Sequence, residues 1–247
     1  MKILIHGIMG RMGREVLRLA LEGYHGATGA VGVDMNGGVP EVECYTSLDD
    51  AYGKADIIID FSHHTAIGAL CDFAVKANMP LVVATTGHTD EELALISEAA
   101  KSIPVFHSAN MSLGVALLVE LAKTAAKAMP DAEIEIIEKH HNRKLDAPSG
   151  TALMVANAIK TVRPKSTFTL GRSGMAKRTP QEIGIHAIRM GNIVGEHEVI
   201  VGTDTQTITL KHEAHSRALF AEGAVVAAEF LIRQGKGLYS MQDIVKF

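Results

Sequence analysis

In the first 111 residues of this chain, short apolar runs alternate with stretches whose apolar residues recur at helical spacing. The apolar runs predict strands at Lys2–His6, Ala30–Asp34, Asp56–Ser62, Pro80–Thr86 and Pro104–Ser108. The stretches between them predict helices at Arg11–Leu21, Leu48–Tyr52, Thr65–Ala77 and Thr89–Lys101. Strands that are apolar on both faces and are separated by helices form parallel sheets with helices on both sides. The pattern therefore predicts an α/β domain with a doubly wound parallel sheet over residues 1–111.

The second half of the chain follows a different pattern. Helices are expected at Ser112–Met129, Thr151–Val162 and Ser216–Arg233, and strands at Ala132–Lys139, Ile183–Arg189, His197–Val201 and Gln206–His212. The last three strands follow one another without a helix between them, which indicates a mixed or antiparallel sheet. We expect an α+β domain over residues 112–216, with Arg163–Pro180 as a surface loop. The helix and tail over residues 217–247 are expected to return to the first domain, which otherwise lacks a closing element.

Composition and charge exclude several classes of protein. Hydrophobic residues make up 47% of the chain and charged residues 21%, which excludes a disordered chain. The formal net charge is −4, Trp is absent and aromatic residues make up 4%, so the chain lacks the features that bind nucleic acid. Cys44 and Cys71 form no disulfide framework, no signal peptide is recognisable, and no run approaches the ~20 apolar residues of a spanning helix. We expect a soluble, cytoplasmic protein without a membrane partner.

A glycine-rich turn joins the first expected strand to the first expected helix. Gly7, Gly10 and Gly13 form the pattern G-x-x-G-x-x-G, and Asp34 ends the next strand 21 residues after Gly13. Glycines let the backbone approach a pyrophosphate, the start of the helix offers N–H groups to it, and the acid accepts hydrogen bonds from ribose hydroxyls. The motif predicts a dinucleotide site. The alternative is an ordinary glycine-rich turn that binds no ligand.

Two further motifs lie where later strands of the same sheet end. Thr85–Gly87 follows the fourth expected strand, and Ala109–Met111 follows the fifth. Ligands of open α/β sheets bind at the carboxyl ends of the strands, so these small and amide side chains are candidates to face a nicotinamide. The alternative is a pair of plain connections in which Thr89 or Ser112 caps the following helix.

The segment Glu138–Ala152, EKHHNRKLDAPSGTA, carries the second candidate site. Ser149–Thr151 opens a helix, and the N–H groups and hydroxyls there make an anion pocket. Four basic residues stand just before it: His140, His141, Arg143 and Lys144. A cationic pocket of this kind suits a carboxylate, and a histidine beside it can deliver a proton near neutral pH. A solvated basic loop before a capped helix is the alternative.

No metal site is expected. None of the twelve histidines lies in an HExxH motif or in a Cys/His cluster with ligand spacing. We expect structural roles for His107, His186 and His197. Arg217, expected just inside the last helix, fits either a surface ion pair or a contact with a ligand.

The motifs GIMGRMGR, DFS, VVATTG, SANMSLGV, EKHHNRKLDAPSGTA and VGEHEVIVG together resemble the dihydrodipicolinate reductase family, also called 4-hydroxy-tetrahydrodipicolinate reductases. They run in the family's order from residue 3 to about residue 220. The resemblance implies an N-terminal Rossmann domain and a C-terminal domain whose sheet packs into a homotetramer. It implies reduction of a cyclic imine to tetrahydrodipicolinate by NADH or NADPH, in the pathway to lysine and diaminopimelate.

The resemblance also assigns roles to individual residues. His140 matches the family's proton donor, and Lys144 its catalytic or substrate-binding lysine. The expected substrate contacts are His141, Lys144, Ser149, Gly150, Thr151 and Arg217. With the glycine turn and the strand-end motifs, the expected cofactor-binding residues are Gly7, Gly10, Arg11, Met12, Gly13, Asp34, Thr85, Thr86, Gly87, Ala109, Asn110 and Met111.

One departure concerns the choice of cofactor. Several family members follow the acid of the second strand with Arg, which pairs with a 2′-phosphate, whereas Met35 and Asn36 follow Asp34 here. Arg11 remains as a cation in the glycine turn. Two rival functions stay open: a non-catalytic NAD(P)-binding sensor, which has no use for Lys144 beside Ser149–Thr151, and another imine or aldehyde reductase on the same scaffold.

Overall fold

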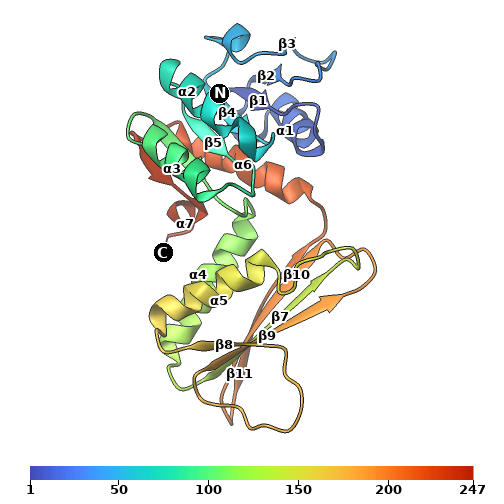
Figure 1. Cartoon of the computed structure of the whole chain (residues 1–247), viewed down its shortest axis with the longest axis vertical. Helices are drawn as coiled ribbons and strands as arrows, with labels where there is room; N and C mark the ends of the chain where they lie inside the picture. The colour runs from blue at the N-terminus through green and yellow to red at the C-terminus, as the bar shows by residue number, and fades with distance from the viewer. Residues whose placement is uncertain (247) are drawn as a thin grey trace. The chain divides into compact units, whose positions relative to one another are not determined.

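The computed structural model of the chain describes residues 1–246 and divides them into two compact units. The first unit contains Met1–Ser112 and Ala218–Ile244 (Figure 1). The second contains Leu113–Arg217 and the tail that starts at Val245. No helix within residues 1–246 is long and apolar enough to cross a membrane.

A seven-stranded sheet forms the centre of the first unit. Its spatial order is β12-β6-β5-β4-β1-β2-β3, and every neighbouring pair is parallel. The strands are β1 (Lys2–His6), β2 (Gly29–Val33), β3 (Cys44–Tyr45), β4 (Ile57–Asp60), β5 (Leu81–Val83), β6 (Pro104–His107) and β12 (Gly237–Tyr239). The predicted doubly wound parallel sheet is confirmed. Its order reverses beside β1, so the carboxyl end of β1 lies at the switch point where open sheets bind ligands.

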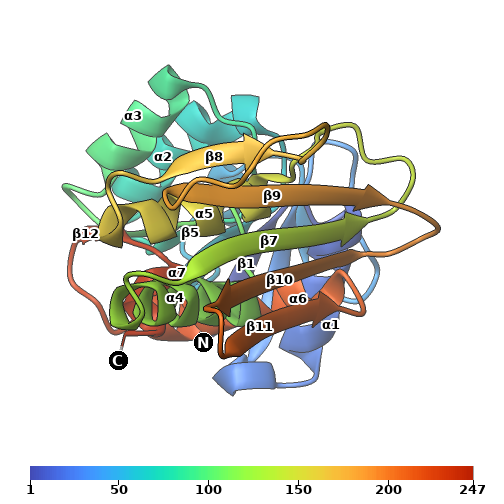
Figure 2. The same cartoon turned by 90° about the horizontal axis from the view of Figure 1, so that it is seen from below.

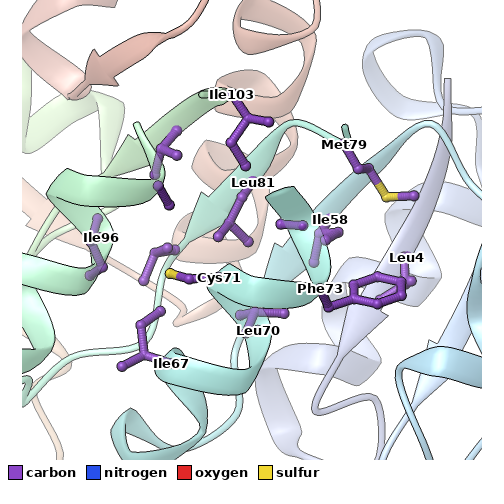
Figure 3. Close-up of a cluster of buried hydrophobic side chains, with 14 of the residues drawn as sticks. Leu4, Ile58, Ile67, Leu70, Cys71, Phe73, Met79, Leu81, Ile96 and Ile103 are labelled. Carbon is purple, nitrogen blue, oxygen red and sulfur yellow. The ribbon is translucent and has the colours of Figure 1, made fainter. Parts of the chain in front are cut away.

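Helices cover both faces of this sheet. They are α1 (Arg11–Leu21), α2 (Ile67–Lys76), α3 (Asp90–Ala99), α6 (Ala218–Leu231) and α7 (Met241–Ile244). Alternate strand residues such as Leu4, Ile58 and Leu81 pack under α2 and α3 in a buried cluster that includes Leu70 and Phe73 (Figure 3). The residues between them face the other layer, where the ring of Phe106 meets that of Phe230 on α6.

Several expected elements of this unit change length, and two strands and one α-helix are new. The expected helix Leu48–Tyr52 is a single 3-10 turn at Asp49–Ala51, and Thr65–Ala77 begins with another 3-10 turn at His64–Ala66. Thr89 caps α3, as the alternative for that connection predicts, in a reciprocal capping box with Glu92. Strands β3 and β12 and helix α7 are too short to show a periodic pattern.

The second unit is a five-stranded sheet with two helices on one of its faces (Figure 2). The spatial order is β11-β10-β7-β9-β8. The strands are β7 (Glu133–His140), β8 (Thr167–Leu170), β9 (Glu182–Arg189), β10 (Gly195–Gly202) and β11 (Thr207–Ala214), and the helices are α4 (Leu113–Ala128) and α5 (Gly150–Val162). We call the face that packs on α4 and α5 the inner face. Ile134 and Ile136 of β7 belong to the core there, together with Val155 of α5.

The structure corrects one expectation for this sheet and confirms another. Part of the segment Arg163–Pro180, which was expected to be a loop, is strand β8, which pairs in parallel with β9. Of the two arrangements expected, mixed or antiparallel, the mixed one is observed, because β9 also pairs in parallel with β7. The connection from β9 to β10 therefore passes the end of β7, where the N–H of Met190 donates to the carbonyl of His140. The sheet is mixed, with antiparallel pairs only on the β10 side of β7.

Candidate active site

The glycine turn after β1 is held by close backbone packing. Gly7 has φ +85°, and a Cβ there would lie 2.7 Å from the carbonyl oxygen of Phe61. A Cβ on Gly13 would lie 2.2 Å from the carbonyl oxygen of Gly7. Any larger residue at either position would therefore force the turn open. Gly10 is the N-cap of α1 and offers no side chain to the first N–H groups of the helix, which have no acceptor within it.

Asp34 follows β2 and is bonded to the glycine turn. Its Oδ2 accepts a hydrogen bond from the N–H of Met9 at 3.0 Å, and its Oδ1 accepts one from the N–H of Asn36 at 2.9 Å. The carboxylate is thus fixed beside the turn with lone pairs left over for hydroxyl donors. Met35 is 85% exposed and Arg11 is exposed, so neither is committed to the core.

The end of β5 provides further polar groups. Thr85 is buried, and its hydroxyl has no hydrogen-bond partner among residues 1–246, although buried hydroxyls normally have one. Thr86 and Gly87, which follow it, are exposed. With the tight glycine turn, the fixed Asp34 and this unpaired hydroxyl, the carboxyl edge of the sheet fits a dinucleotide.

The turn after β6 is internally bonded. Ala109 is exposed, and Met111 is buried. The Oδ1 of Asn110 accepts from the N–H of Ser112 at 2.9 Å, and Ser108 Oγ donates to the carbonyl of Asn110 at 2.8 Å. The amide oxygen of Asn110 therefore shapes the entry to α4.

In the second unit, the inner face of β7 changes from apolar to polar at its carboxyl end. Ile134 and Ile136 are followed on the same face by Glu138 and His140, because alternate strand residues share a face. Glu138 is fully buried and His140 is 9% exposed. The Nδ1 of His140 lies 2.6 Å from Oε2 of Glu138. The Nε2 of His140 makes no hydrogen bond to any of the described residues, and it lies 3.1 Å from where a Cβ on Gly195 would be.

Glu138 accepts hydrogen bonds from two other segments as well as from His140 on its own strand. Arg189 at the end of β9 donates to both carboxylate oxygens, at 2.8 and 2.7 Å. The N–H of Ser149 at the start of α5 donates to Oε1 at 2.9 Å. Burial on its own raises the pKa of a carboxyl group, but the hydrogen bonds from His140, Arg189 and Ser149 outweigh it and lower the pKa of Glu138 to about 2. Glu138 is therefore a carboxylate at every working pH.

His197 on β10 belongs to the same cluster, although a merely structural role was expected for it. Its Nε2 lies 3.1 Å from Ser149 Oγ, and its ring meets the ring of His140 at 5.2 Å between centroids. Burial first, and then the charge of His140, lower the pKa of His197 to about 4. His197 is thus a neutral imidazole beside His140. His107 and His186 lie elsewhere, His107 beside His88 on the first sheet and His186 paired with Glu135 on the outer face of the second.

Cationic side chains gather where the loop after β7 begins. Burial, and after it the charges of Arg143, Arg217, His140 and Lys144, lower the pKa of His141. Lys144 Nζ forms an ion pair with Asp146 at 2.8 Å. Arg143 donates to Asn192 Oδ1 at 2.6 Å, which ties the loop to the β9–β10 connection. Arg217 is exposed and precedes α6 rather than lying within it as expected.

Helix α5 begins beside this cluster. Ser149 is its N-cap, with Oγ accepting from the N–H of Ala152 at 3.2 Å, and the residue is 2% exposed. Gly150 is exposed with open space around it, and Thr151 is half-buried. The hydroxyl of Ser149 is thus engaged within the protein, whereas the following residues lie nearer the surface. The structure gathers His140, His141, Lys144 and Ser149–Thr151 in one region.

Two residues of this site were given no role on sequence grounds. Glu138 was part of the quoted motif, and Arg189 was only the end of an expected strand. The available signal was the period-2 alternation of β7, which puts Glu138 on the face of Ile134 and Ile136, and a charged residue on such a face needs a partner. Within residues 1–246, no group of three His, Cys, Asp or Glu side chains could hold a metal ion.

Two family models match the chain. The model described as the N-terminus of dihydrodipicolinate reductase matches residues 1–111, and the model described as its C-terminus matches residues 114–245.

Curated relatives and a solved structure align along nearly the whole chain. The 4-hydroxy-tetrahydrodipicolinate reductase of Caldanaerobacter subterraneus subsp. tengcongensis is 49% identical over 247 residues, covering 99% of this chain and 98% of the relative. The enzyme of the same name from Clostridium novyi is 41% identical over 248 residues, with coverage of 99% and 98%. The dipicolinate-bound dihydrodipicolinate reductase from Paenisporosarcina sp. TG-14 has a TM-score of 0.80 at 25% identity and covers 99% of both chains.

Proposed function

The chain belongs to the dihydrodipicolinate reductase family, and on this premise we propose that it reduces the cyclic imine 4-hydroxy-tetrahydrodipicolinate (dihydrodipicolinate) to tetrahydrodipicolinate with NADH or NADPH. The product serves lysine and diaminopimelate biosynthesis. The observation that carries the proposal is His140, whose Nδ1 is held by a buried carboxylate while its Nε2 has no partner among residues 1–246 and lies beside a group of cations.

The first unit would hold the cofactor at the carboxyl edge of its sheet. The glycine turn would receive the pyrophosphate, because the turn is tight and the first N–H groups of α1 have no acceptor within the helix. The residues that would make this contact are Gly7, Gly10, Arg11, Met12 and Gly13. Asp34 would accept hydrogen bonds from the adenosine ribose. The nicotinamide side would meet the following residues, which include the unpaired buried hydroxyl of Thr85: Thr85, Thr86, Gly87, Ala109, Asn110 and Met111. When bound, the reduced nicotinamide supplies the hydride.

The second unit would hold a small dicarboxylate. The cations of Lys144 and Arg217 and the ring of His141 supply charge and hydrogen-bond donors, and Gly150 and Thr151 lie at the start of α5. Lys144 already pairs with the carboxylate of Asp146. When substrate binds, the Lys144 ammonium would bind a substrate carboxylate in place of Asp146 or together with it. Ser149 contributes by capping α5 and so orienting the N–H groups of its first turn.

His140 would provide the proton. Reduction of the conjugated imine adds a hydride and leaves an anionic, enamine-like centre that needs one proton. That proton leaves the N–H bond at Nε2 of the imidazolium and forms the new bond to substrate. The ring returns to its neutral form and keeps its other proton at Nδ1, against Glu138. A new proton from water then restores the imidazolium.

The proposal is tested by following the absorbance of reduced nicotinamide with and without the product of the coupled synthase. Consumption only in its presence supports the proposal. Lys144→Ala should raise KM, because the variant loses a charge contact with substrate and transition state alike. Lys139→Ala, on the outer face and paired with Glu196, is the matched control and should leave KM unchanged. Dinucleotide binding without any turnover would favour the sensor, and turnover of unrelated imines or aldehydes would favour another reductase.

We also propose that the protein works in the cytoplasm as a homotetramer assembled through the outer face of the second sheet. Helices α4 and α5 cover only the inner face of that sheet. On the outer face, Ile137, Ile188 and Ile200 alternate with charged residues, and Ile188 is 37% exposed. Light scattering at micromolar concentration should give four copies. A monomer of 26.4 kDa would refute the assembly without touching the reaction.

A further inference from the structure

The reaction as derived above uses the buried carboxylate of Glu138 only as the hydrogen-bond partner of Nδ1 of His140. It lies at 0% exposure on the inner face of β7, where the preceding inner residues Ile134 and Ile136 are apolar. A buried charge is costly unless it is paired and fully hydrogen-bonded. Apolar residues could close the core at this position, so the presence of a carboxylate calls for a reason beyond packing.

The carboxylate of Glu138 contacts one imidazole ring, that of His140. Oε2 of Glu138 lies 2.6 Å from Nδ1 of His140, and an ionised carboxylate can only accept a hydrogen bond. Nδ1 must therefore carry a proton in both the neutral and the charged ring. The only site of the ring that changes protonation is then Nε2, the atom without a partner among residues 1–246.

Arg189 acts on the same carboxylate from β9. Its two terminal nitrogens donate to the two oxygens of Glu138, and Nη2 also donates to the carbonyl of Asp146 at 2.6 Å. The guanidinium thus fixes the plane of the carboxylate and offsets part of its charge. The carboxylate stabilises a charged His140, and Arg189 opposes that effect.

Resting on the proposed function, we infer that Glu138 and Arg189 are positioning residues that set which nitrogen of His140 carries the transferable proton and that act in opposite senses on the charge of the ring. Glu138 directs the proton to Nε2 and favours the imidazolium. Arg189 holds Glu138 in place and limits that preference, so that the ring can release the proton. In this assignment both residues act through His140.

The charged and titratable groups around His140 are few, and they come from four segments. They are Glu138 on β7, Arg189 on β9, His197 on β10, and His141 and Lys144 on the loop after β7. His197 is neutral at working pH, and the loop cations belong to the substrate region. Glu138 and Arg189 are therefore the two groups whose removal should change the charge of the His140 ring in opposite directions.

The test is the pH dependence of kcat in four proteins: wild type, Glu138→Gln, Arg189→Met and the double variant. Glu138→Gln should move the alkaline limb of kcat to lower pH, by about one to three pH units, because the imidazolium loses its carboxylate. Arg189→Met should move the limb to higher pH. The alkaline limb of the double variant should lie between those of wild type and Glu138→Gln. In Glu138→Gln the Arg189 guanidinium remains without its carboxylate and opposes the imidazolium, whereas the double variant lacks that guanidinium. A merely structural pair would lower activity without opposite shifts.

The outer face of β7 offers a matched control. Glu135 lies three residues before Glu138, so it points to the other face, and it pairs with His186 at 2.8 Å and Arg178 at 3.2 Å. Glu135→Gln removes a carboxylate from a cluster of the same composition on the same strand. It should leave the alkaline limb where it is in wild type. A limb that moves as much as in Glu138→Gln would overturn the inference.

A second measurement needs neither turnover nor substrate. Nitrogen NMR of histidine-labelled protein, with the His140 signal assigned by its loss in His140→Ala, reports which ring nitrogen is protonated. Wild type should show Nδ1 protonated throughout and Nε2 titrating, and Glu138→Gln should lose that order. Nε2 protonated in the neutral wild-type ring would overturn the inference even if Glu138→Gln does not fold. If wild type shows no reductase activity but the expected NMR pattern, the proposed function fails and the proton placement stands.

Discussion

The candidate site of the first unit is formed mainly by backbone, whereas the candidate site of the second unit is formed by charged and polar side chains. In the first unit, the turn at Gly7–Gly13 depends on backbone that can come close, and side chains contribute little beyond Asp34. In the second unit, the site is a network of side chains centred on Glu138 and His140. The comparison teaches that a site made of backbone tolerates no added atoms, whereas a site made of charges tolerates no lost partner.

The largest effect that separates the two sites is expected from His140→Ala. Loss of a proton donor typically costs about 10²–10⁴-fold in rate, and it should appear in kcat. Binding of the dinucleotide, measured separately by fluorescence of the reduced nicotinamide, should stay near wild type because the residue belongs to the second unit. His186→Ala is the control, since that ring also pairs with a glutamate but lies on the outer face. A near wild-type kcat in His140→Ala would mean that the side-chain network of the second unit does not supply the proton.

The free energy of unfolding at acid pH should show how much the charge network around Glu138 stabilises the fold. The pKa of Glu138 is lowered from 4.5 to about 2 in the folded protein. A lowered folded-state pKa means that the stabilisation is fully present above the unfolded-state pKa and is lost as pH falls from about 4.5 through about 2. The stabilisation is roughly 3 kcal/mol. Urea unfolding at a series of pH values should show the gap between wild type and Glu138→Gln closing across that window. A gap of constant size would contradict this.

The backbone site should fail when an atom is added. Gly13→Ala puts a Cβ 2.2 Å from the carbonyl oxygen of Gly7, so the turn must shift. Overpacking of this kind costs about 1–3 kcal/mol, and we expect dinucleotide affinity to fall by roughly ten- to a hundredfold. Gly68→Ala on α2 is the control, because its Cβ would meet Leu95 at an ordinary 3.6 Å. Isothermal titration with NADH compares the two, and unchanged affinity in Gly13→Ala would show that the turn adapts.

The same contrast explains what the sequence could predict. The parallel sheet and the glycine turn follow from local patterns, because hydrophobic period and glycine spacing act within a few residues. The place of β9 beside β7 does not, because strand order in a sheet is decided by packing between distant segments. Strand β8 (TFTL) lies partly exposed at the edge of its sheet and lacks the continuous apolar run by which the equally short β4 (IIID) was predicted.

At the second site the sequence predicted the residues that lie together in one motif and missed their partners. His140, Lys144 and Ser149–Thr151 are close in sequence, so a single motif contains them. Arg189 lies 51 residues beyond Glu138, and only the parallel register of β7 with β9 brings them together. For the same reason His197, expected to be structural, proved to be a neighbour of His140 through the pairing of β10 with β7.

The smallest effect concerns the carboxylate of the backbone site. Asp34 carries its negative charge where the 2′ substituent of the adenosine ribose would lie, and its carboxylate is fixed by the N–H groups of Met9 and Asn36. It favours a 2′-hydroxyl, which donates to it, and repels a 2′-phosphate. Met35 is 85% exposed and offers no cation, so the offsetting charge is expected from Arg11 in the glycine turn. We expect NADH to be at least as good a substrate as NADPH by kcat/KM.

Met35→Arg should move the ratio of kcat/KM values toward NADPH by up to about tenfold, which corresponds to about 1.4 kcal/mol of new pairing. Both cofactors are compared at fixed low salt, because screening weakens charge effects at this exposed position. Met175→Arg, a fully exposed methionine of the second unit, controls for the added charge and should leave the ratio unchanged. A wild-type preference for NADPH of tenfold or more would mean that Arg11 outweighs Asp34, and that side-chain charge governs the backbone site as well.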